Sequence, residues 1–262
     1  MCVLPSAALA EEQEQAADTD SVSCGCVNRG GLAAAATLEP EGPGYVIPEP
    51  WRARGLRYGT QELVGLIRRA AAAVAREHPG ARLGVADLSL RRGGAARHHR
   101  SHQSGRDVDL LYYAVDASDQ PVAPGGCMPS YGPDRRASRC ASPERREVAP
   151  RRFDVARNWA LVRAMLTDEH VRVRVIFMSL GVRRWLLEHA ASLGEPRALI
   201  RRAEGILLRP PGPRAHTDHM HVRIACTLDD RRRGRCRTDP DPRGRWFGRL
   251  RCPRRTVAAA AR

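Results

Sequence analysis

Lysine is absent from the sequence: all 44 residues counted as lysine or arginine are arginines. This bias is typical of GC-rich coding, and it weakens any functional argument that rests on one arginine position. Aromatic residues are also scarce, at 5%, so aliphatic side chains must fill the core. The chain has 262 residues and is 42% hydrophobic, which allows one large domain or two small ones.

Several familiar motifs are absent as well. No apolar run reaches the roughly 18 residues that a membrane-spanning helix needs, so we expect no transmembrane segment. No two cysteines have the C-x-x-C spacing that marks structural zinc and redox sites. Neither Gly-x-Ser-x-Gly nor Ser-x-x-Lys occurs, which argues against a serine nucleophile.

The net charge of +15 is strongly positive. Such a charge favours polyanions: nucleic acid, anionic lipid or the acidic polymers of a cell wall. The sequence shows no recognition helix and no four-cysteine zinc finger. We therefore expect no nucleic-acid partner, and a basic surface without specific function remains the alternative.

Eight cysteines occur in the loop-rich parts of the chain, a distribution that suits disulfides and an oxidising compartment. Two short loops are each bracketed by a cysteine pair, and a further cysteine lies near the C-terminus. We expect the pairs Cys127–Cys140 and Cys226–Cys236, and a link from Cys252 to Cys24 or Cys26.

The N-terminus resembles the end of a signal peptide. Ala8-Leu9-Ala10 fits the small-x-small cleavage rule, although the basic region and most of the apolar region before it are missing. Either the true start lies upstream of Met1 or the match is chance. We interpret residues 1–23 as a signal-peptide remnant and disordered lead, 24–226 as the functional domain, and 227–262 as a basic, disulfide-tethered tail of a periplasmic or secreted protein.

Hydrophobic periodicity predicts a mixture of helices and strands. Thr60 can cap a helix that ends at His78. Alternation of apolar and polar residues predicts strands at residues 82–90, 107–115, 171–177 and 219–226. Helical periodicity predicts helices at about 155–166, 181–193 and 196–207. Residues 24–58 and 117–152 read as irregular. No regular βαβ repeat is present, so we predict an α+β domain whose small antiparallel sheet is flanked by helices.

Six of the nine histidines fall in two short clusters, at residues 98–102 and 216–221. Side chains alternate along a strand, so His219 and His221 share one face of the last strand. The opposite face is apolar and suits the core: Met220, Val222 and Ile224. This strand therefore buries one side and offers two imidazoles, common ligands of zinc, on the other.

The first cluster leads into a strand that presents carboxylates. Asp107 and Asp109 share one face, and His102 lies in the turn before them, where Gly105 lets the backbone bend. His102 and Asp109 can converge on one ion, and His221 would complete the set. Two imidazoles and one carboxylate match the three protein ligands of a catalytic zinc, whose fourth position stays open.

The segments SHQSGRDVD and HTDHMHVR resemble the penicillin-insensitive murein endopeptidases. These are zinc peptidases, related to D-Ala-D-Ala metallopeptidases, whose signature is His-x6-Asp followed by His-x-His. Here the two elements are His102 to Asp109 and His219-x-His221. The resemblance runs from about Asn28 to Cys226 and includes GVADLSLRRGG and FDVARNWALVRAM. It is specific, because both elements occur with their flanking residues.

This resemblance implies one catalytic Zn²⁺ held by His102, Asp109 and His221. It also implies that His99 matches a position that holds a second metal ion. The remaining ligands of such a site should lie in the middle region, but residues 113–159 contain no histidine. Three roles for His99 therefore stay open: ligand of a second ion, support of the first ion's ligands, or contact with the substrate.

The implied reaction is hydrolysis of peptide cross-links in peptidoglycan, at the amide between D-Ala and meso-diaminopimelate. We expect His216 or Asp218 to act as the base and His219 to stabilise the oxyanion. Arg223, or else Arg106, could pair with the free carboxylates of the substrate.

Three other interpretations are open. A D,D-carboxypeptidase or D-Ala-D-Ala dipeptidase could use the same scaffold and trim terminal residues. A zinc-containing module that binds the wall without catalysis is a second, although a structural zinc has four closed ligands and needs no spare base. Nucleic-acid binding driven by charge is a third, with no motif in its support.

Overall fold

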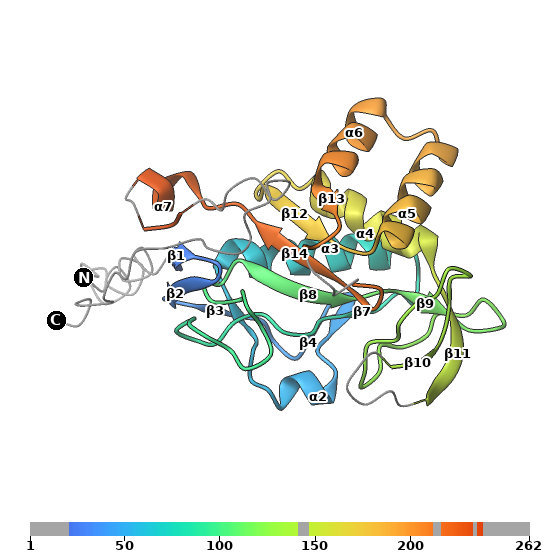
Figure 1. Cartoon of the computed structure of the whole chain (residues 1–262), viewed down its shortest axis with the longest axis horizontal. Coiled ribbons are helices and arrows are strands. Elements are labelled where there is room, and N and C mark those ends of the chain that lie inside the picture. The colour runs from blue at the N-terminus through green and yellow to red at the C-terminus, as the bar shows by residue number, and fades with distance from the viewer. Residues whose placement is uncertain (1–20, 141–146, 212–215, 233–234, 238–262) are drawn as a thin grey trace, which may run out of the picture.

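The computed structural model describes residues 21–140, 147–211, 216–232 and 235–237 of the chain (Figure 1). Helices and short strands are mixed, as the α+β prediction requires. None of the described helices is both long and apolar enough to cross a bilayer. The proposed cleavage site at residues 8–10 and most of the predicted basic tail lie outside the described residues.

A four-stranded sheet forms the centre of the fold, in the order β13-β12-β14-β8. The four strands are β8 (Asp107–Leu111), β12 (Val173–Phe177), β13 (Leu207–Leu208) and β14 (His219–Ile224). β14 pairs antiparallel with both β8 and β12, which agrees with the prediction of an antiparallel sheet. The prediction of a purely antiparallel sheet is corrected at one edge, where the two-residue β13 pairs parallel with β12.

The longer helices lie where the periodicity predicts them. They are α3 (Gln61–Glu77), α4 (Val155–Leu166), α5 (Leu180–Ser192) and α6 (Arg197–Ile206). Thr60 caps α3 as predicted, since its Oγ1 accepts a hydrogen bond from the Leu63 amide. Asp154 and Ser179 cap α4 and α5 in the same way. A short helix, α7 (Leu228–Arg232), follows the last strand.

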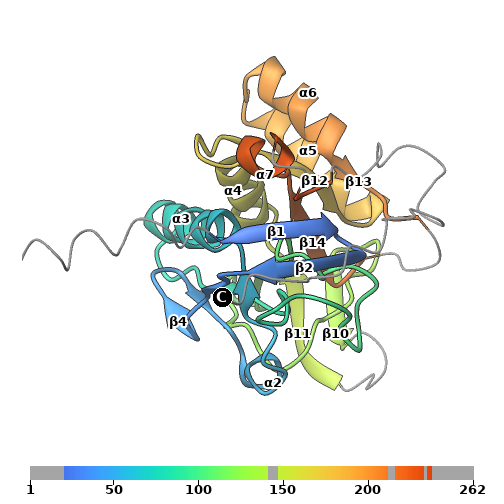
Figure 2. The same cartoon turned by 90° about the vertical axis from the view of Figure 1, so that its left-hand side faces the viewer.

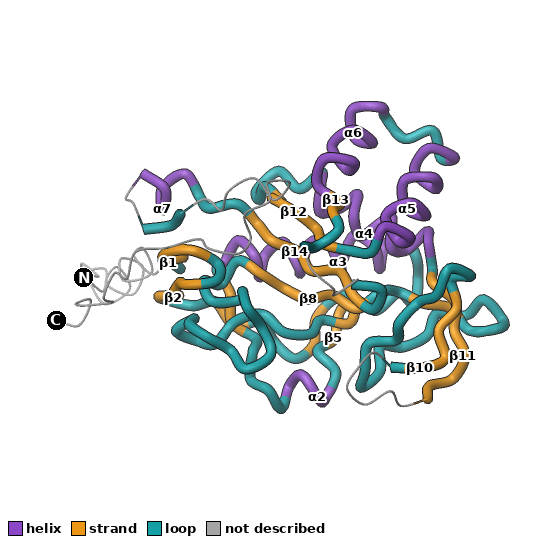
Figure 3. Tube along the Cα trace, in the orientation of Figure 1, coloured by secondary structure: helices purple, strands orange, loops and turns teal. Residues whose placement is uncertain are grey.

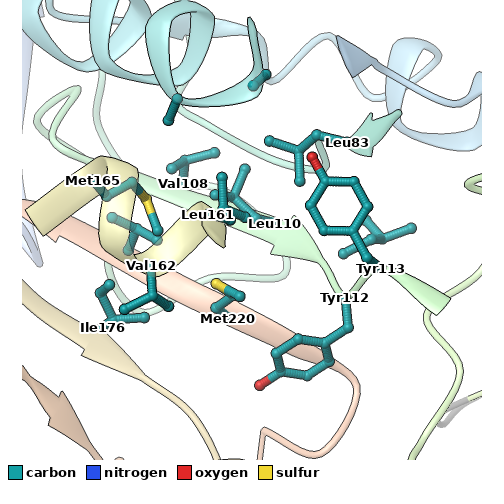
Figure 4. Packing of buried hydrophobic residues seen from close by; sticks show 14 of the residues in the cluster. Leu83, Val108, Leu110, Tyr112, Tyr113, Leu161, Val162, Met165, Ile176 and Met220 are labelled. Atoms are coloured by element: carbon teal, nitrogen blue, oxygen red, sulfur yellow. The ribbon is translucent and has the colours of Figure 1, made fainter. Parts of the chain in front are cut away.

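One face of the sheet is buried against helices. Val108 and Leu110 of β8 and Met220 of β14 are almost fully buried and belong to one cluster with side chains of α3 and α4. Figure 4 shows this cluster, with Leu161 and Met165 projecting from α4. Each such side chain contributes about 1.5–3 kcal/mol of transfer free energy. Because side chains alternate, the residues between them face the other side.

The N-terminal part is more ordered than predicted. It contains short pieces of regular structure: β1 (Val22–Cys26), β2 (Arg29–Ala33), β3 (Ala36–Thr37), β4 (Glu41–Gly42), β5 (Tyr45–Val46), α2 (Glu49–Arg52) and β6 (Tyr58–Gly59). β1 begins inside the segment interpreted as a disordered lead, because it pairs along its length with β2 (Figure 2). The other strands have only two residues each, too few for a periodic signal.

Two further predictions need correction. The strand predicted at residues 82–90 is reduced to β7 (Leu83–Gly84), and the chain after it makes only isolated bridges, one of them Val85 with Leu110. The predicted loop at 117–152 contains β10 (Arg136–Arg139) and β11 (Glu147–Phe153), which extend from β9 (Ala114–Val115) as a separate sheet. Loops still make up much of the chain before β8 (Figure 3).

Two of the predicted disulfides are confirmed. Cys127–Cys140 and Cys226–Cys236 are both present. Cys26 is also disulfide-bonded, whereas Cys24 is a half-buried free thiol. The predicted link from Cys252 falls on a residue outside the described ranges.

Candidate metal centre

The centre is built on the face of β8 and β14 that points away from the helices. The antiparallel register places His221 directly opposite Asp109, and Arg223 directly opposite Asp107. Directly opposed residues share a face, so these four polar side chains form two adjacent rows. Phe177 of β12 lies opposite His221 and extends that row.

Three ligand atoms converge at the first row. His221 Nδ1 lies 3.0 Å from Asp109 Oδ1 and 3.3 Å from His102 Nε2, and the last two atoms are 3.4 Å apart. A tetrahedral ion with bonds of 2.0–2.1 Å would have its ligands about 3.3 Å apart. All three residues are buried, with exposed fractions of 1% for His102, 4% for Asp109 and 7% for His221. The three atoms are therefore spaced to hold one metal ion.

The backbone around His102 fixes which of its nitrogens faces the centre. Its Nδ1 donates a hydrogen bond to the carbonyl of Leu88 at 2.8 Å, so the lone pair is left on Nε2. His102 adopts a left-handed conformation with φ of 65°, unusual for a residue other than glycine. Its amide donates to the Asp107 carboxylate at 3.0 Å, which helps to hold this conformation.

Asp107 lies behind the three ligand atoms and is completely buried. Arg223 donates two hydrogen bonds to it, from Nε at 2.7 Å and from Nη2 at 3.1 Å. His221 Nε2 faces the same carboxylate at 3.6 Å. Burial alone would raise the pKa of Asp107, but Arg223 and His221 outweigh it and hold the pKa well below its usual range.

The pKa of Asp109 is shifted in the same direction. Burial acts to raise it, and the imidazoles of His102 and His219 lower it further than burial raises it. Both carboxylates of the centre are therefore ionised at neutral pH. An ionised carboxylate is the form that binds a cation.

His99 lies beside the three ligand atoms. Its ring centroid is 4.1 Å from that of His102, and its Nδ1 is 3.6 Å from Asp109 Oδ2. The other nitrogen, Nε2, lies 2.8 Å from Asp87, a buried carboxylate that also accepts a hydrogen bond from Arg54. Asp87 was not selected from the sequence. An acidic residue inside the apolar stretch GVADLSL was the signal that could have found it.

Besides the set described above, spacing alone admits two further overlapping sets of three ligands among the described residues: His99, His102 and Asp109, or His102, Asp107 and His221. Each set contains His102. In the second set, Asp107 is already engaged by Arg223 and by the amide of His102. The set of His102, Asp109 and His221 leaves both of these contacts intact, and it does not use His99, which is engaged by Asp87.

The second histidine cluster borders the centre. Asp218 Oδ1 accepts a hydrogen bond from His219 Nδ1 at 2.9 Å, and His219 Nε2 lies 3.7 Å from Asp109 Oδ1. The ring of His216 stacks at 4.6 Å from that of His219. His216 Nδ1 is buried and has no hydrogen-bond partner among the described residues. The sequence-predicted trio is therefore close together.

His216 is held firmly, although its φ of 49° is also left-handed. Its carbonyl accepts hydrogen bonds from the Tyr112 hydroxyl at 3.2 Å and from the Ser179 amide at 3.1 Å. Burial, assisted by the neighbouring imidazoles of His219 and His221, lowers the pKa of His216 to about 4.

A disulfide-closed segment supports the loop that carries His216 and Asp218. Ser130 Oγ lies 2.6 Å from Thr217 Oγ1, and the Tyr131 amide donates to the Thr217 carbonyl at 3.0 Å. Both contacts come from the segment bracketed by Cys127 and Cys140. The spacing of the cysteines predicted the disulfide, but not this contact with the centre.

The two arginines expected to bind substrate are buried instead. The exposed fraction of Arg106 is 2% and that of Arg223 is 4%. Arg106 donates to the Ser23 hydroxyl and to the Ile224 carbonyl, and Arg223 donates to Asp107. Neither guanidinium reaches the surface, so in this conformation neither can pair with a substrate carboxylate.

The chain was compared with known proteins. The family model described as penicillin-insensitive murein endopeptidase matches residues 23–245, which is most of the chain. The matched range contains all of the residues of the candidate metal centre. The comparison with curated proteins gives no match.

Proposed function

Because the chain belongs to the penicillin-insensitive murein endopeptidase family, and so to the hydrolases that act on peptidoglycan, we propose that it cuts peptide cross-links with the help of one zinc ion. The proposed bond is the amide between D-Ala and meso-diaminopimelate. The observation that carries the proposal is the convergence of His102 Nε2, Asp109 Oδ1 and His221 Nδ1 at mutual distances of 3.0–3.4 Å.

Zinc fits this set of donors. Two imidazoles and one carboxylate, with no fourth protein ligand assigned among the described residues, are the composition of a catalytic rather than a structural zinc site. When bound, zinc supplies Lewis-acid activation of water and of the scissile carbonyl. His102 and His221 would be oriented by Leu88 and by Asp107, which both lie on the far side of their rings.

The second metal ion that the family resemblance implies would have fewer ligand atoms available to it. His99 Nε2 is engaged by Asp87. Among the described carboxylates, the remaining nitrogen, Nδ1, faces Asp109, which already belongs to the first set. We therefore assign His99 a supporting role. It packs against the ring of His102 and faces the second oxygen of Asp109, so it limits rotation of both.

Proton transfer is assigned to the second histidine cluster. Asp218 is committed to His219, so its role is to orient that imidazole. His219 Nε2 then faces the centre and is placed to stabilise the oxyanion of the tetrahedral intermediate. His216, whose Nδ1 is buried without a partner, is assigned as the base that accepts the proton from water and returns it to the leaving amine.

Export to the periplasm or beyond the cell is part of the proposal. The disulfides Cys127–Cys140 and Cys226–Cys236 are stable in an oxidising compartment. The substrate implied by the family lies in that compartment.

The test is a comparison of three proteins on purified sacculi: the wild type, His102→Ala and His98→Ala. His98 is an exposed neighbour in the same cluster, so its variant is the matched control. We expect His102→Ala to lose at least about 10³-fold in cleavage rate and most of its bound zinc, and His98→Ala to keep both. Cleavage by a metal-free His102→Ala protein would contradict the proposal.

The products separate the alternatives. Cross-linked muropeptide dimers should be converted to monomers. If only monomers lose terminal D-Ala, the protein is a D,D-carboxypeptidase. Zinc binding together with sacculus binding, but without any cleavage, would identify a wall-binding module.

A further inference from the structure

The loop that leads into the metal centre is strongly basic. We call residues 91–100 the arginine loop: it contains four arginines and two histidines and no acidic residue. The nearest acids in the sequence, Asp87 and Asp107, are buried and engaged with partners in the centre. The loop therefore has no acidic neighbour in the sequence to neutralise its charge.

The four guanidinium groups of this loop have no partner among the described residues. Arg91, Arg92, Arg97 and Arg100 are all exposed. In the part of the chain that the structure describes, their side chains make no hydrogen bond and no ion pair. This separates them from Arg106 and Arg223, which lie near the same centre but are buried and paired.

The backbone of the arginine loop is nevertheless held in place. The Arg92 carbonyl accepts a hydrogen bond from the Leu32 amide at 3.0 Å, and the Gly94 amide donates to the Gln103 carbonyl at 2.9 Å. At Gly93, φ is +66° and a Cβ would lie 2.3 Å from the Gln103 carbonyl oxygen, so only glycine fits. Exposed charges on an ordered backbone lose less entropy when they bind a ligand.

The C-terminal end of the arginine loop lies at the edge of the candidate metal centre. A turn bridges Ala96 and His99, so Arg97 lies at its tip. His99 stacks on His102, a proposed metal ligand, with ring centroids 4.1 Å apart. Arg100 follows His99 directly, one Cα–Cα step of about 3.8 Å away. Arg97 and Arg100 therefore start from the rim of the site and carry side chains long enough to reach a bound peptide.

We propose that the arginine loop, chiefly Arg97 and Arg100, is the subsite that binds the free carboxylates of the peptide stems beside the scissile amide. This inference rests on the proposed function. Guanidinium groups bind carboxylates through paired, charge-assisted hydrogen bonds, and free donors next to the reacting centre supply them. The arginine loop thus takes the place of the buried Arg106 and Arg223 in substrate recognition.

The experiment uses the zinc-loaded full chain and two soluble muropeptide dimers, one with free carboxylates and one with the same carboxylates amidated. The variant is Arg97→Gln/Arg100→Gln. The control is Arg201→Gln/Arg202→Gln, which removes the same charge from two exposed arginines of α6. Zinc content is measured for each protein.

For the wild type, we expect amidation of the substrate to raise KM about tenfold. In Arg97→Gln/Arg100→Gln, KM for the free-carboxylate dimer should rise by a similar factor, with kcat within about twofold and zinc content unchanged. The variant should no longer distinguish the two dimers. The control should behave as the wild type does.

Three outcomes would overturn the inference. If Arg97→Gln/Arg100→Gln still distinguishes the free-carboxylate dimer from the amidated dimer as the wild type does, other residues bind the carboxylates. If KM rises equally in the control Arg201→Gln/Arg202→Gln, the effect comes from the overall charge of the protein and not from the arginine loop. Loss of binding only to sacculi that carry phosphate polymers, with KM for both dimers unchanged, would assign the loop to a wall polymer instead. Failure of the proposed function is distinct, because the zinc-loaded wild type would then cut neither dimer.

Discussion

At the scale of single residues, Asp107 contacts His221 but lies outside the proposed ligand set. We expect Asp107→Asn to weaken zinc binding about 10–100-fold, because the carboxylate that orients His221 is lost. Competition with a chromogenic chelator measures this change. The mutation should also destabilise the metal-free protein by about 1–3 kcal/mol, since Arg223 loses its buried charged partner.

Asp168→Asn is the matched control for Asp107→Asn. Asp168 also accepts two hydrogen bonds from one arginine, Arg69, but is remote in sequence from the metal ligands. Its variant should lose stability and keep its zinc affinity. Equal zinc affinity in Asp107→Asn and the wild type would show that Asp107 supports only the fold.

The sequence predicted the proposed ligands but not their surroundings. His102, Asp109 and His221 follow from face alternation along two strands and from a motif, both of which are local patterns. Asp87 could not be placed, because its contact with His99 depends on an irregular segment beside β8. Alternation along the strand places Arg223 on the face of His221, but its partner on the neighbouring strand depends on register, which the sequence pattern did not give.

At the scale of elements, the disulfide Cys127–Cys140 closes the segment that contacts Thr217. A disulfide across a 13-residue separation contributes about 3 kcal/mol by constraining the unfolded chain. We expect Cys127→Ser/Cys140→Ser to lower the free energy of unfolding by about this amount. It should also lower kcat several-fold at unchanged zinc content, because the loop of His216 and Asp218 loses its support.

The second disulfide provides the comparison for this prediction. Cys226→Ser/Cys236→Ser removes a bridge of similar separation, 10 residues, whose Cys236 lies against Gly25 of β1. It should cost stability without changing kcat of the folded fraction. If both double variants lose kcat equally, the contact with Thr217 has no special role.

Helices were predicted better than strands for a physical reason. α3, α4 and α5 carry their own signals, namely an apolar stripe and a capping Thr60, Asp154 or Ser179. A strand of two residues has no period, and its existence depends on a partner far away in the sequence. β5, for example, pairs with β7 across almost 40 residues, so no local pattern could reveal it.

At the scale of the whole molecule, the ion pair of Arg69 and Asp168 joins α3 to the turn after α4. Burial would raise the pKa of Asp168, but Arg69 and the amides of His170 and Val171 lower it below its ordinary value of 3.8. A carboxyl with a lowered folded-state pKa stabilises the fold above its unfolded pKa, and this contribution is lost as the pH falls through the folded-state value.

We therefore expect Asp168→Asn to lower the free energy of unfolding by about 1–2 kcal/mol at neutral pH. The difference from the wild type should shrink once the pH falls below 3.8. Urea denaturation of both proteins at neutral pH and at about pH 3 measures it. A difference that stays constant over this range would mean that the charge of Asp168 is not what stabilises the junction.

The two halves of the proposed ligand set are separated by 112 residues along the chain, from Asp109 to His221. They meet only when β14, the last strand of the sheet, pairs with β8. The part of the chain up to the end of β8 contains only two members of the proposed set, His102 and Asp109. Because the pairing of β14 with β8 is non-local, the proposed ligand set is complete only in the folded chain.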